Sequence, residues 1–244
     1  MHFTIKGVKM EFENINLDAG SPLITKYDDY AAECESALEM TMTRIAIMRR
    51  SLSRISERNP FDRIESRVKT FESTVKKCQR RGYDQTIESI KANVCDIAGI
   101  RIITKYRDEI RIVQNLIEHI PGVNVVHRKD YIKKPKPNGY SSLHLGCQVE
   151  IYTPDGGKLI PVEIQIRSKS MNLWASIEHD IKYKNDNPDP RVEGYFKKIA
   201  GLLEEFDRVS MELRDYSETT EQVANANSKA AAITEDGCSA LRSC

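Results

Sequence analysis

Apolar residues at helical spacing dominate the first third of the chain. Between Tyr30 and the stop at Asn59-Pro60 they recur at steps of three and four residues, at Cys34, Leu38, Thr41, Ile45, Met48, Leu52 and Ile55. Such steps keep one face of a helix apolar, so a long amphipathic helix is predicted here. A second helix is predicted to end at Gly82, with Ile64, Val68, Phe71, Val75 and Cys78 on one face, and a short helical segment follows over 84–90.

The middle of the chain carries the signals of a β-sheet. Residues 97–103 are β-branched and almost wholly apolar, which is typical of a central strand buried on both faces. A helix is predicted over 110–120, where Pro121-Gly122 closes it, and a strand over 123–127. The clearest alternation of apolar and polar residues follows in two runs, 143–151 and 160–166. These runs predict an antiparallel hairpin.

The register of this hairpin decides what its polar face contains. With Pro154-Asp155-Gly156-Gly157 as a four-residue loop, the opposed pairs on that face are His144 with Arg167, Gly146 with Gln165, and Gln148 with Glu163. The face has two interpretations, plain exposure to solvent or the floor of an active site.

Two further helices complete the pattern. One is predicted over 170–184, and the last carries an apolar stripe of Val192, Phe196, Ile199, Leu203, Phe206, Val209 and Leu213. Beyond Ser217 the sequence loses its periodicity, which favours a flexible tail. The predicted organisation is an N-terminal extension (1–24), a single domain (25–216) and the tail (217–244).

The overall charge excludes a broadly basic nucleic-acid binder, because 37 Lys and Arg face 36 Asp and Glu in 244 residues. A basic site must therefore be local. The chain has no apolar run of membrane-spanning length and no signal-peptide core, and its six cysteines show no metal-binding spacing. We therefore expect a cytoplasmic protein with reduced thiols and no membrane partner.

Two local basic clusters stand out against this balance. The run 127–136 holds Arg128, Lys129, Lys133, Lys134 and Lys136 against the single acid Asp130. It continues through Pro137-Asn138-Gly139 to Tyr140, so a rigid basic loop ends in a ring that can stack on a base. The second cluster comprises Arg63, Arg67, Lys69, Lys76, Lys77, Arg80 and Arg81, the first three expected on one helix. Solvated surface is the alternative interpretation of both.

Two carboxylates are candidate metal ligands if the fold brings them together. Asp96 precedes the central strand and Glu163 lies on the hairpin. Paired carboxylates supply the hard oxygen ligands of Mg²⁺ in phosphoryl transfer. The sequence contains neither a P-loop nor a G-x-G-x-x-G motif, which excludes those two modes of nucleotide binding.

Taken together, four blocks resemble the synthetase domain of RelA/SpoT-type enzymes, and the length is similar to that of a small alarmone synthetase. The blocks are Arg67-Val-Lys69, Asp96-Ile-Ala-Gly-Ile-Arg101, the segment from Asp130-Tyr-Ile through Pro135-Lys-Pro-Asn-Gly-Tyr140 to His144, and Glu163-Ile-Gln-Ile-Arg167. The resemblance implies an α/β (α+β) fold, a nucleotidyltransferase-like mixed β-sheet flanked by helices, with long N- and C-terminal helices.

The resemblance also implies an activity and a site. The reaction would move pyrophosphate from ATP to the ribose 3′-hydroxyl of GDP or GTP, with Mg²⁺ or Mn²⁺ as cofactor. Arg67 and Arg101 would sandwich adenine, and Lys69 would contact the ATP phosphates. Asp96 and Glu163 would be the catalytic residues and the metal ligands, Glu163 also drawing the proton from the 3′-hydroxyl. The guanine nucleotide would be held by Lys129, Lys136, Asn138, Tyr140, His144, Gln165 and Asn172, with Tyr140 stacking on the base.

Some positions depart from the family pattern. Ser141 stands where an arginine is frequent, and His127 opens a block associated with acceptor preference, so GMP, GDP and GTP stay open as acceptors. The single His179-Asp180 pair, with no second histidine block, predicts that a hydrolase module is missing.

Two other functions stay open. One is pyrophosphate transfer to the 3′ end of tRNA, and the other is a non-catalytic guanine-nucleotide or RNA-binding module. The long terminal helices suggest a homotetramer, and an alarmone or single-stranded RNA is a possible allosteric ligand.

Overall fold

The computed structural model describes residues 21–55, 58–184 and 190–240, and the core of the fold is one mixed sheet. Its strands are β1 (Phe61–Val68), β2 (Ala98–Thr104), β3 (Val123–Asp130), β4 (Leu143–Thr153) and β5 (Gly156–Ser168). Their order is β1-β2-β5-β4-β3, with β2 and β5 parallel and the other neighbours antiparallel. The expected mixed sheet flanked by helices is confirmed. Most of the predicted 1–24 extension (residues 1–20) and the end of the tail (241–244) lie outside the described residues.

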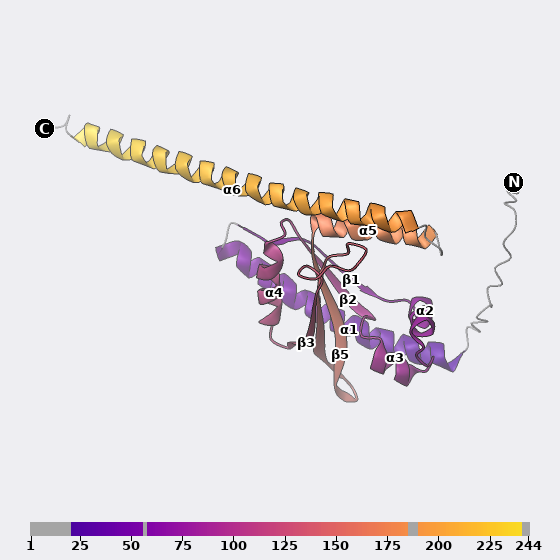
Figure 1. Ribbon diagram of the computed structural model, residues 1–244. Coiled ribbons are helices and arrows are strands. Elements are labelled where there is room, and N and C mark those ends of the chain that lie inside the picture. Colours follow the sequence, from indigo (N-terminus) through magenta and orange to yellow (C-terminus); the bar gives the residue numbers. More distant parts are fainter. Residues whose placement is uncertain (1–20, 56–57, 185–189, 241–244) are drawn as a thin grey trace, which may run out of the picture.

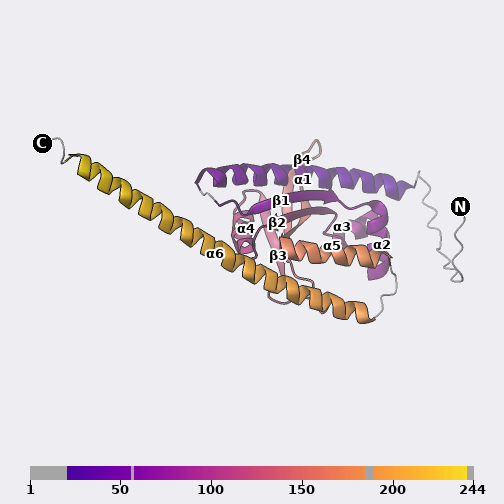
Figure 2. The same ribbon diagram turned by 90° about the horizontal axis from the view of Figure 1, so that it is seen from above.

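Helices cover both sides of the sheet. They are α1 (Pro22–Ile55), α2 (Phe71–Arg81), α3 (Ile87–Asn93), α4 (Glu109–Glu118), α5 (Lys169–Lys184) and α6 (Pro190–Ala240). Helix α1 lies along one side of the sheet, whereas α5 and α6 lie side by side on the other (Figure 2). Helix α6 continues far past the sheet (Figure 1). None of the helices in the described ranges combines the length and apolar character needed to cross a bilayer.

The main core lies between the sheet and α1. Every second residue of β5 is buried there, at Ile160, Val162, Ile164 and Ile166, together with Ile100 and Ile102 of β2. Helix α1 contributes Tyr27, Tyr30, Cys34, Ala37, Leu38 and Ile45 to the same cluster. The predicted long helix and central strand are therefore confirmed, and the polar residues between the buried ones of β5 point to the opposite face.

The prediction of a helix through Ile64 and Val68 was wrong. Residues 61–68 form β1, which pairs with β2, and helix α2 begins only at Phe71, after the N-cap residue Thr70. The spacing of Ile64, Val68 and Phe71 fits a helical face, but an edge strand with one solvated face tolerates the same residues. As a result, Arg63 and Arg67 are carried by a strand and lie on one face of the sheet.

The hairpin register was also wrong, by two residues. His144 lies opposite Gln165, and Gly146 lies opposite Glu163. The reason is a tighter turn: Thr153 pairs with Gly156, which leaves only Pro154 and Asp155 as the loop. Gly156 has a φ of 114°, a backbone angle that favours glycine. A slip of two residues keeps the same side chains on the same face.

The last helix differs from its prediction in two ways. Its helical structure continues past Ser217 to Ala240. Its apolar residues also divide between two faces: Phe196 is buried against Trp174, with Val192, Ile199 and Leu203 beside them, whereas Phe206, Val209 and Leu213 are exposed. One helical stripe in the sequence therefore corresponds to a buried face and a separate exposed face.

A buried carboxylate fastens α6 to the end of β5 and the start of α5. Asp207 is 4 % exposed and accepts hydrogen bonds from Ser168 at 3.0 Å and from Ser170 at 2.5 Å. Burial raises the pKa of Asp207 above its ordinary value, although the two hydroxyls oppose this shift. Asp207 thus stabilises the fold most when it is protonated, and this contribution is lost as pH rises through its raised folded-state pKa.

We expect Asp207→Asn to be more stable than the parent chain at neutral pH, with the difference shrinking toward acidic pH. An amide oxygen can accept both serine hydrogen bonds without a buried charge. Asp207→Leu, which leaves both hydroxyls without this acceptor, is expected to lower the free energy of unfolding by about 1–3 kcal/mol. Urea denaturation of the three proteins across this pH range provides the measurement. Equal stability of parent and Asp207→Asn at neutral pH would contradict the argument.

Candidate functional site

The strand registers place the polar motif residues on one face of the sheet, opposite α1. Across β1, β2 and β5, Arg67 pairs with Gly99 and Gly99 with Glu163. One step along, Arg101 pairs with Gln165, and Gln165 with His144 of β4. Because directly paired residues share a face, residues from four separate sequence blocks meet there.

Two adjacent cavities open on this face. The first has a volume of ≈ 370 Å³ and is lined by Glu65, Ser66, Arg67, Asp96, Gly99, Ile100, Arg101, Glu163 and Gln165. The second has a volume of ≈ 690 Å³ and is lined by Arg63, Glu65, Arg67, Arg101, Tyr140, Gln165, Arg167, Asn172, Ala175, Ser176, Glu178 and His179. Arg67, Arg101, Glu65 and Gln165 line both. The two predicted carboxylates, Asp96 and Glu163, thus face the same cavity, and the ring of Tyr140 reaches the neighbouring one.

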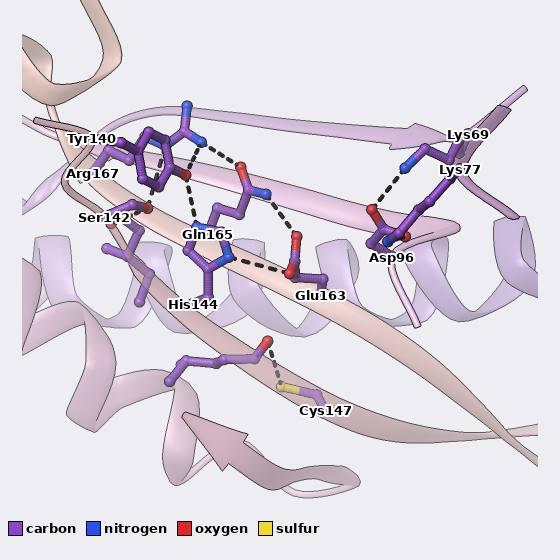
Figure 3. A network of polar contacts seen from close by, with 12 residues as sticks. Lys69, Lys77, Asp96, Tyr140, Ser142, His144, Cys147, Glu163, Gln165 and Arg167 are labelled. Carbon is purple, nitrogen blue, oxygen red and sulfur yellow. Dashed lines mark hydrogen bonds and ion pairs between the residues drawn. The ribbon is translucent and has the colours of Figure 1, made fainter. Parts of the chain in front are cut away.

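Asp96 is held by two lysines (Figure 3). Its Oδ2 accepts a hydrogen bond from Lys69 Nζ at 2.7 Å, and its Oδ1 accepts one from Lys77 Nζ at 2.6 Å. Burial acts to raise the pKa of Asp96, but the two ammonium groups outweigh it and the pKa is lowered. Asp96 is therefore ionised at neutral pH. Lys77 belongs to the second basic cluster of the sequence, but nothing in its spacing distinguished it from the neighbouring lysine and arginines.

Glu163 also has both oxygens hydrogen-bonded (Figure 3). Its Oε1 lies 3.2 Å from His144 Nδ1, and its Oε2 accepts a hydrogen bond from Gln165 Nε2 at 2.6 Å. Burial acts to raise the pKa of Glu163, yet His144 and Gln165 lower it below its usual value. The site thus holds two ionised carboxylates at one cavity, and each keeps lone pairs for a further partner.

Positive charge is concentrated between the two cavities. Burial and the charges of Arg167 and Arg67 lower the pKa of the Arg101 guanidinium. Within the described residues, Arg101 Nε is buried without a hydrogen-bond partner, and NH1 lies 3.6 Å from Glu65. Guanidinium groups crowded in this way are typical of a site for phosphorylated or planar ligands.

The loop between β3 and β4 forms one wall of the site. Tyr140 is 8 % exposed, and its ring packs against Trp174 and Tyr131. Asn138 Nδ2 donates to Glu178 of α5 at 2.7 Å, and Lys136 Nζ lies 4.6 Å from the centre of the Tyr140 ring.

The predicted guanine-binding residues are only partly brought together. Tyr140, Gln165 and Asn172 line the larger cavity, and His144 contacts both Tyr140 and Glu163. Lys129, in contrast, lies on β3 opposite His144 and lines neither cavity. Lys136 lines a separate pocket of ≈ 300 Å³ behind the loop, between the loop and α6.

His127 is a neighbour of the site that the sequence marked only as the start of a block associated with acceptor preference. It pairs with Gly146, which in turn pairs with Glu163. A Cβ on Gly146 would lie 1.9 Å from His127 Cε1, so the imidazole occupies the space that any larger residue at position 146 would need. A glycine interrupting the alternation of β4 was the one signal that could have pointed to it.

No cluster of three or more His, Cys, Asp or Glu side chains that could bind a metal by themselves occurs in the described part of the chain. Two carboxylates at one cavity nevertheless fit Mg²⁺, which is usually bound through one or two carboxylates together with substrate phosphates. The donor set is therefore suited to a metal that arrives with a nucleotide.

The comparisons with known proteins agree with this geometry. Residues 66–188 match the family model described as a region found in RelA / SpoT proteins. The GTP pyrophosphokinase YwaC of Bacillus subtilis (strain 168) is 39 % identical over 155 residues, which cover 64 % of this chain and 74 % of the relative. The GTP pyrophosphokinase YjbM of the same organism is 29 % identical over 191 residues, which cover 78 % of this chain and 89 % of the relative.

A solved structure shows the same fold. Small alarmone synthetase 1 from Bacillus subtilis, in a crystal structure with its product pppGpp, superimposes with a TM-score of 0.74 at 28 % identity, over 79 % of this chain and 98 % of that chain. A mixed sheet with carboxylates and several basic side chains around paired cavities is the arrangement of a nucleotidyltransferase-like fold. Within that class, the chain belongs to the RelA/SpoT family.

Proposed function

We propose that this chain is a GTP pyrophosphokinase of the small alarmone synthetase type. It would transfer the pyrophosphate group of ATP to the ribose 3′-hydroxyl of GDP or GTP and release AMP. The observation that carries the proposal is the convergence of Asp96 and Glu163 on one cavity that shares the arginines Arg67 and Arg101 with a second. The names of the relatives support the same reaction.

The paired cavities suit the electrostatic demand of this reaction. Two nucleotides that repel one another must be brought into contact, and positive side chains reduce that repulsion. Arg67 and Arg101 line both cavities, so their guanidinium groups can contact the donor and the acceptor. Lys69 and Lys77 bring two more positive charges to the edge of the smaller cavity, which we assign to the ATP phosphates.

We assign the role of proton acceptor to Glu163. In the transfer, the 3′-oxygen forms a bond to the β-phosphorus of ATP, the bond between that phosphorus and the α–β bridging oxygen breaks, and the hydroxyl proton leaves to a base. The lowered pKa keeps Glu163 ionised, as an acceptor must be. Asp96 and Glu163 would also hold the divalent metal, which when bound neutralises charge on the phosphate oxygens.

Separation of the nucleotides after incubation with ATP, Mg²⁺ and each of GMP, GDP, GTP and tRNA tests the proposal. We expect AMP together with a 3′-pyrophosphorylated guanine nucleotide. The acceptor consumed fastest identifies the preferred one. Transfer to tRNA alone would assign the chain to the RNA-modifying alternative. Binding of guanine nucleotides without AMP release would assign it to the non-catalytic one.

We further propose that copies of the chain associate through α6. Five exposed residues of this helix, Leu202, Phe206, Val209, Leu213 and Tyr216, follow one another at alternating steps of four and three. Their exposed fractions run from 47 % to 74 %. This is the spacing of a coiled-coil seam, which is complementary to a second helix with the same spacing, and a two-fold axis would bring the same stripe of another copy against it. Such a pair would be one interface of the expected tetramer.

Leu213→Glu in this stripe is expected to halve the oligomeric mass or reduce it to that of the monomer, because it places a charge in the seam. Size-exclusion chromatography with light scattering measures the mass. Leu159→Glu is the matched control, since Leu159 is 56 % exposed but lies on β5, away from α6. A parent chain that is already monomeric, or a mass unchanged in Leu213→Glu, would overturn this interface.

A further inference from the structure

Five side chains of the site form a closed ring of hydrogen bonds (Figure 3). Two arms leave Arg167 NH2: one goes to Tyr140 Oη at 2.6 Å, and the other to Gln165 Oε1 at 2.8 Å. The first arm continues from Tyr140 Oη to His144 Nε2 at 2.7 Å and from His144 Nδ1 to Glu163 Oε1 at 3.2 Å. The second continues from Gln165 Nε2 to Glu163 Oε2 at 2.6 Å. Both arms end on the carboxylate proposed to receive the proton.

Arg167 and Glu163, the two residues at which the arms of the ring meet, determine where the protons between them lie. A guanidinium group can only donate, and an ionised carboxylate can only accept. Tyr140 Oη accepts from Arg167, so the phenolic proton is left to be donated to His144 Nε2. His144 must then carry its own proton on Nδ1 and donate it to Glu163. In the same way, Gln165 has its oxygen toward Arg167 and its NH₂ group toward Glu163.

The opposite tautomer of His144 would disrupt this order. A proton on Nε2 would meet Tyr140 Oη as a second donor, and the phenolic hydrogen would have to turn from His144 to Ser142 Oγ, which also accepts from Arg167 Nε at 3.3 Å. At the same time Nδ1 would direct a lone pair at the carboxylate of Glu163. The donor that sits at the far end of the ring therefore decides which nitrogen of His144 is protonated.

Arg167 lines the larger cavity, but three of its five N–H donors are used on neighbouring side chains. It is 5 % exposed, and its Nε donates to Ser142 Oγ at 3.3 Å, while NH2 makes the two contacts of the ring. Its guanidinium also lies against the Tyr140 ring, 5.2 Å from the centre. Most of its donors are thus committed inside the protein.

We propose that Arg167 is a positioning residue that, through Tyr140 and Gln165, holds His144 in the Nδ1-protonated tautomer and fixes both oxygens of Glu163 in the orientation that accepts the 3′-hydroxyl proton. The proposal rests on the proposed function for its effect on catalysis. The arrangement of protons in the ring does not depend on that function.

The experiment compares the full-length parent with Arg167→Met, a substitution of similar length without donors. Long-range ¹H–¹⁵N NMR spectra of the histidine rings identify which nitrogen of His144 is protonated, the signal being assigned with His144→Gln. We expect the parent to show Nδ1–H and the variant to show a mixture of both tautomers. The kcat of pyrophosphate transfer should fall about 10–100-fold, the range typical when a partner of a metal ligand is removed, with KM for both nucleotides within about threefold.

Arg208→Met is the matched control, because Arg208 is an exposed residue of α6 that, among the described residues, pairs with Glu205 and Glu212 of its own helix. It should leave the tautomer and kcat as in the parent. Should Arg167→Met fail to fold, Tyr140→Phe breaks the same arm one residue further on and is expected to mix the tautomers.

Three results would overturn the proposal. The first is an unchanged Nδ1–H tautomer in the folded variant. The second is an unchanged kcat. The third is a raised KM at constant kcat, which would mean that Arg167 binds a nucleotide directly. If the parent makes no product from any acceptor, the proposed function fails, but the NMR comparison still reports on the ring.

Discussion

Glu163→Gln is expected to lower kcat by about 10²–10⁴-fold, the range attributed to a positioned general base, while the chain stays folded. Glutamine keeps the size of the side chain and can still accept one hydrogen bond. It cannot take up the 3′-hydroxyl proton, and it removes one of the three carboxylates, Glu65, Asp96 and Glu163, that line the smaller cavity. Release of AMP from ATP in the presence of GDP or GTP measures the rate.

Glu33→Gln is the control for the loss of a half-buried carboxylate. Glu33 pairs with Lys158 at 2.6 Å and lines neither cavity of the site. It should keep the rate of the parent, and circular dichroism should show that both variants are folded. A Glu163→Gln variant with the activity of the parent would remove Glu163 from the reaction and leave Asp96 and Glu65 as the acidic residues of the smaller cavity.

Asp96→Asn is expected to lower kcat by about 10²–10³-fold, as the loss of a preorganised charge at a reaction centre does, and to raise the KM for ATP. The parent carboxylate accepts from Lys69 and Lys77 through separate oxygens. An asparagine can accept from one lysine only, and its NH₂ group would face the other. Both lysines would then be less well positioned for the ATP phosphates, and the proposed metal would lose a ligand.

The magnesium dependence separates these two roles of Asp96. If the loss of a metal ligand dominates, a higher Mg²⁺ concentration should recover part of the activity of Asp96→Asn. If the displacement of the two lysines dominates, a higher Mg²⁺ concentration should not recover activity, and the main change should be a raised KM for ATP. Asp62→Asn, whose parent residue pairs with Lys169 at 2.9 Å outside both cavities, serves as control. Unchanged kcat and KM in Asp96→Asn would contradict both roles.

The elements with the strongest periodicity could be predicted from the sequence, and the weaker ones could not. The apolar run at 97–103 and the long helix before Asn59 are both present, because burial on one or two faces leaves a regular pattern. Strand β1 was mistaken for a helix because Ile64 and Val68, four residues apart, fit both periods, and Phe71 at the start of α2 extends the helical spacing. The pairing partner that decides between them, β2, lies about 30 residues away in the sequence.

The site, too, could be predicted from the sequence only in part. Asp96 and Glu163 could be selected as a pair from their chemistry, and they share a cavity. The two-residue error in the hairpin register did not move them, because it kept every side chain on its predicted face. Lys77 and His127, in contrast, become neighbours of these carboxylates only through the packing of α2 and β3. No local pattern in the sequence encodes the contact of Lys77, and only the glycine at position 146 could have pointed to His127.

The direct continuation of β5 into α5 has a consequence for how the protein can move. Strand β5 ends at Ser168 and α5 begins at Lys169, so Glu163, Gln165 and the wall that carries Asn172 form one continuous segment without a hinge. The loop of residues 131–142 lies between β3 and β4, tied to α5 by the hydrogen bond from Asn138 to Glu178. Opening and closing around a nucleotide should therefore occur by displacement of this loop against a rigid strand-helix unit.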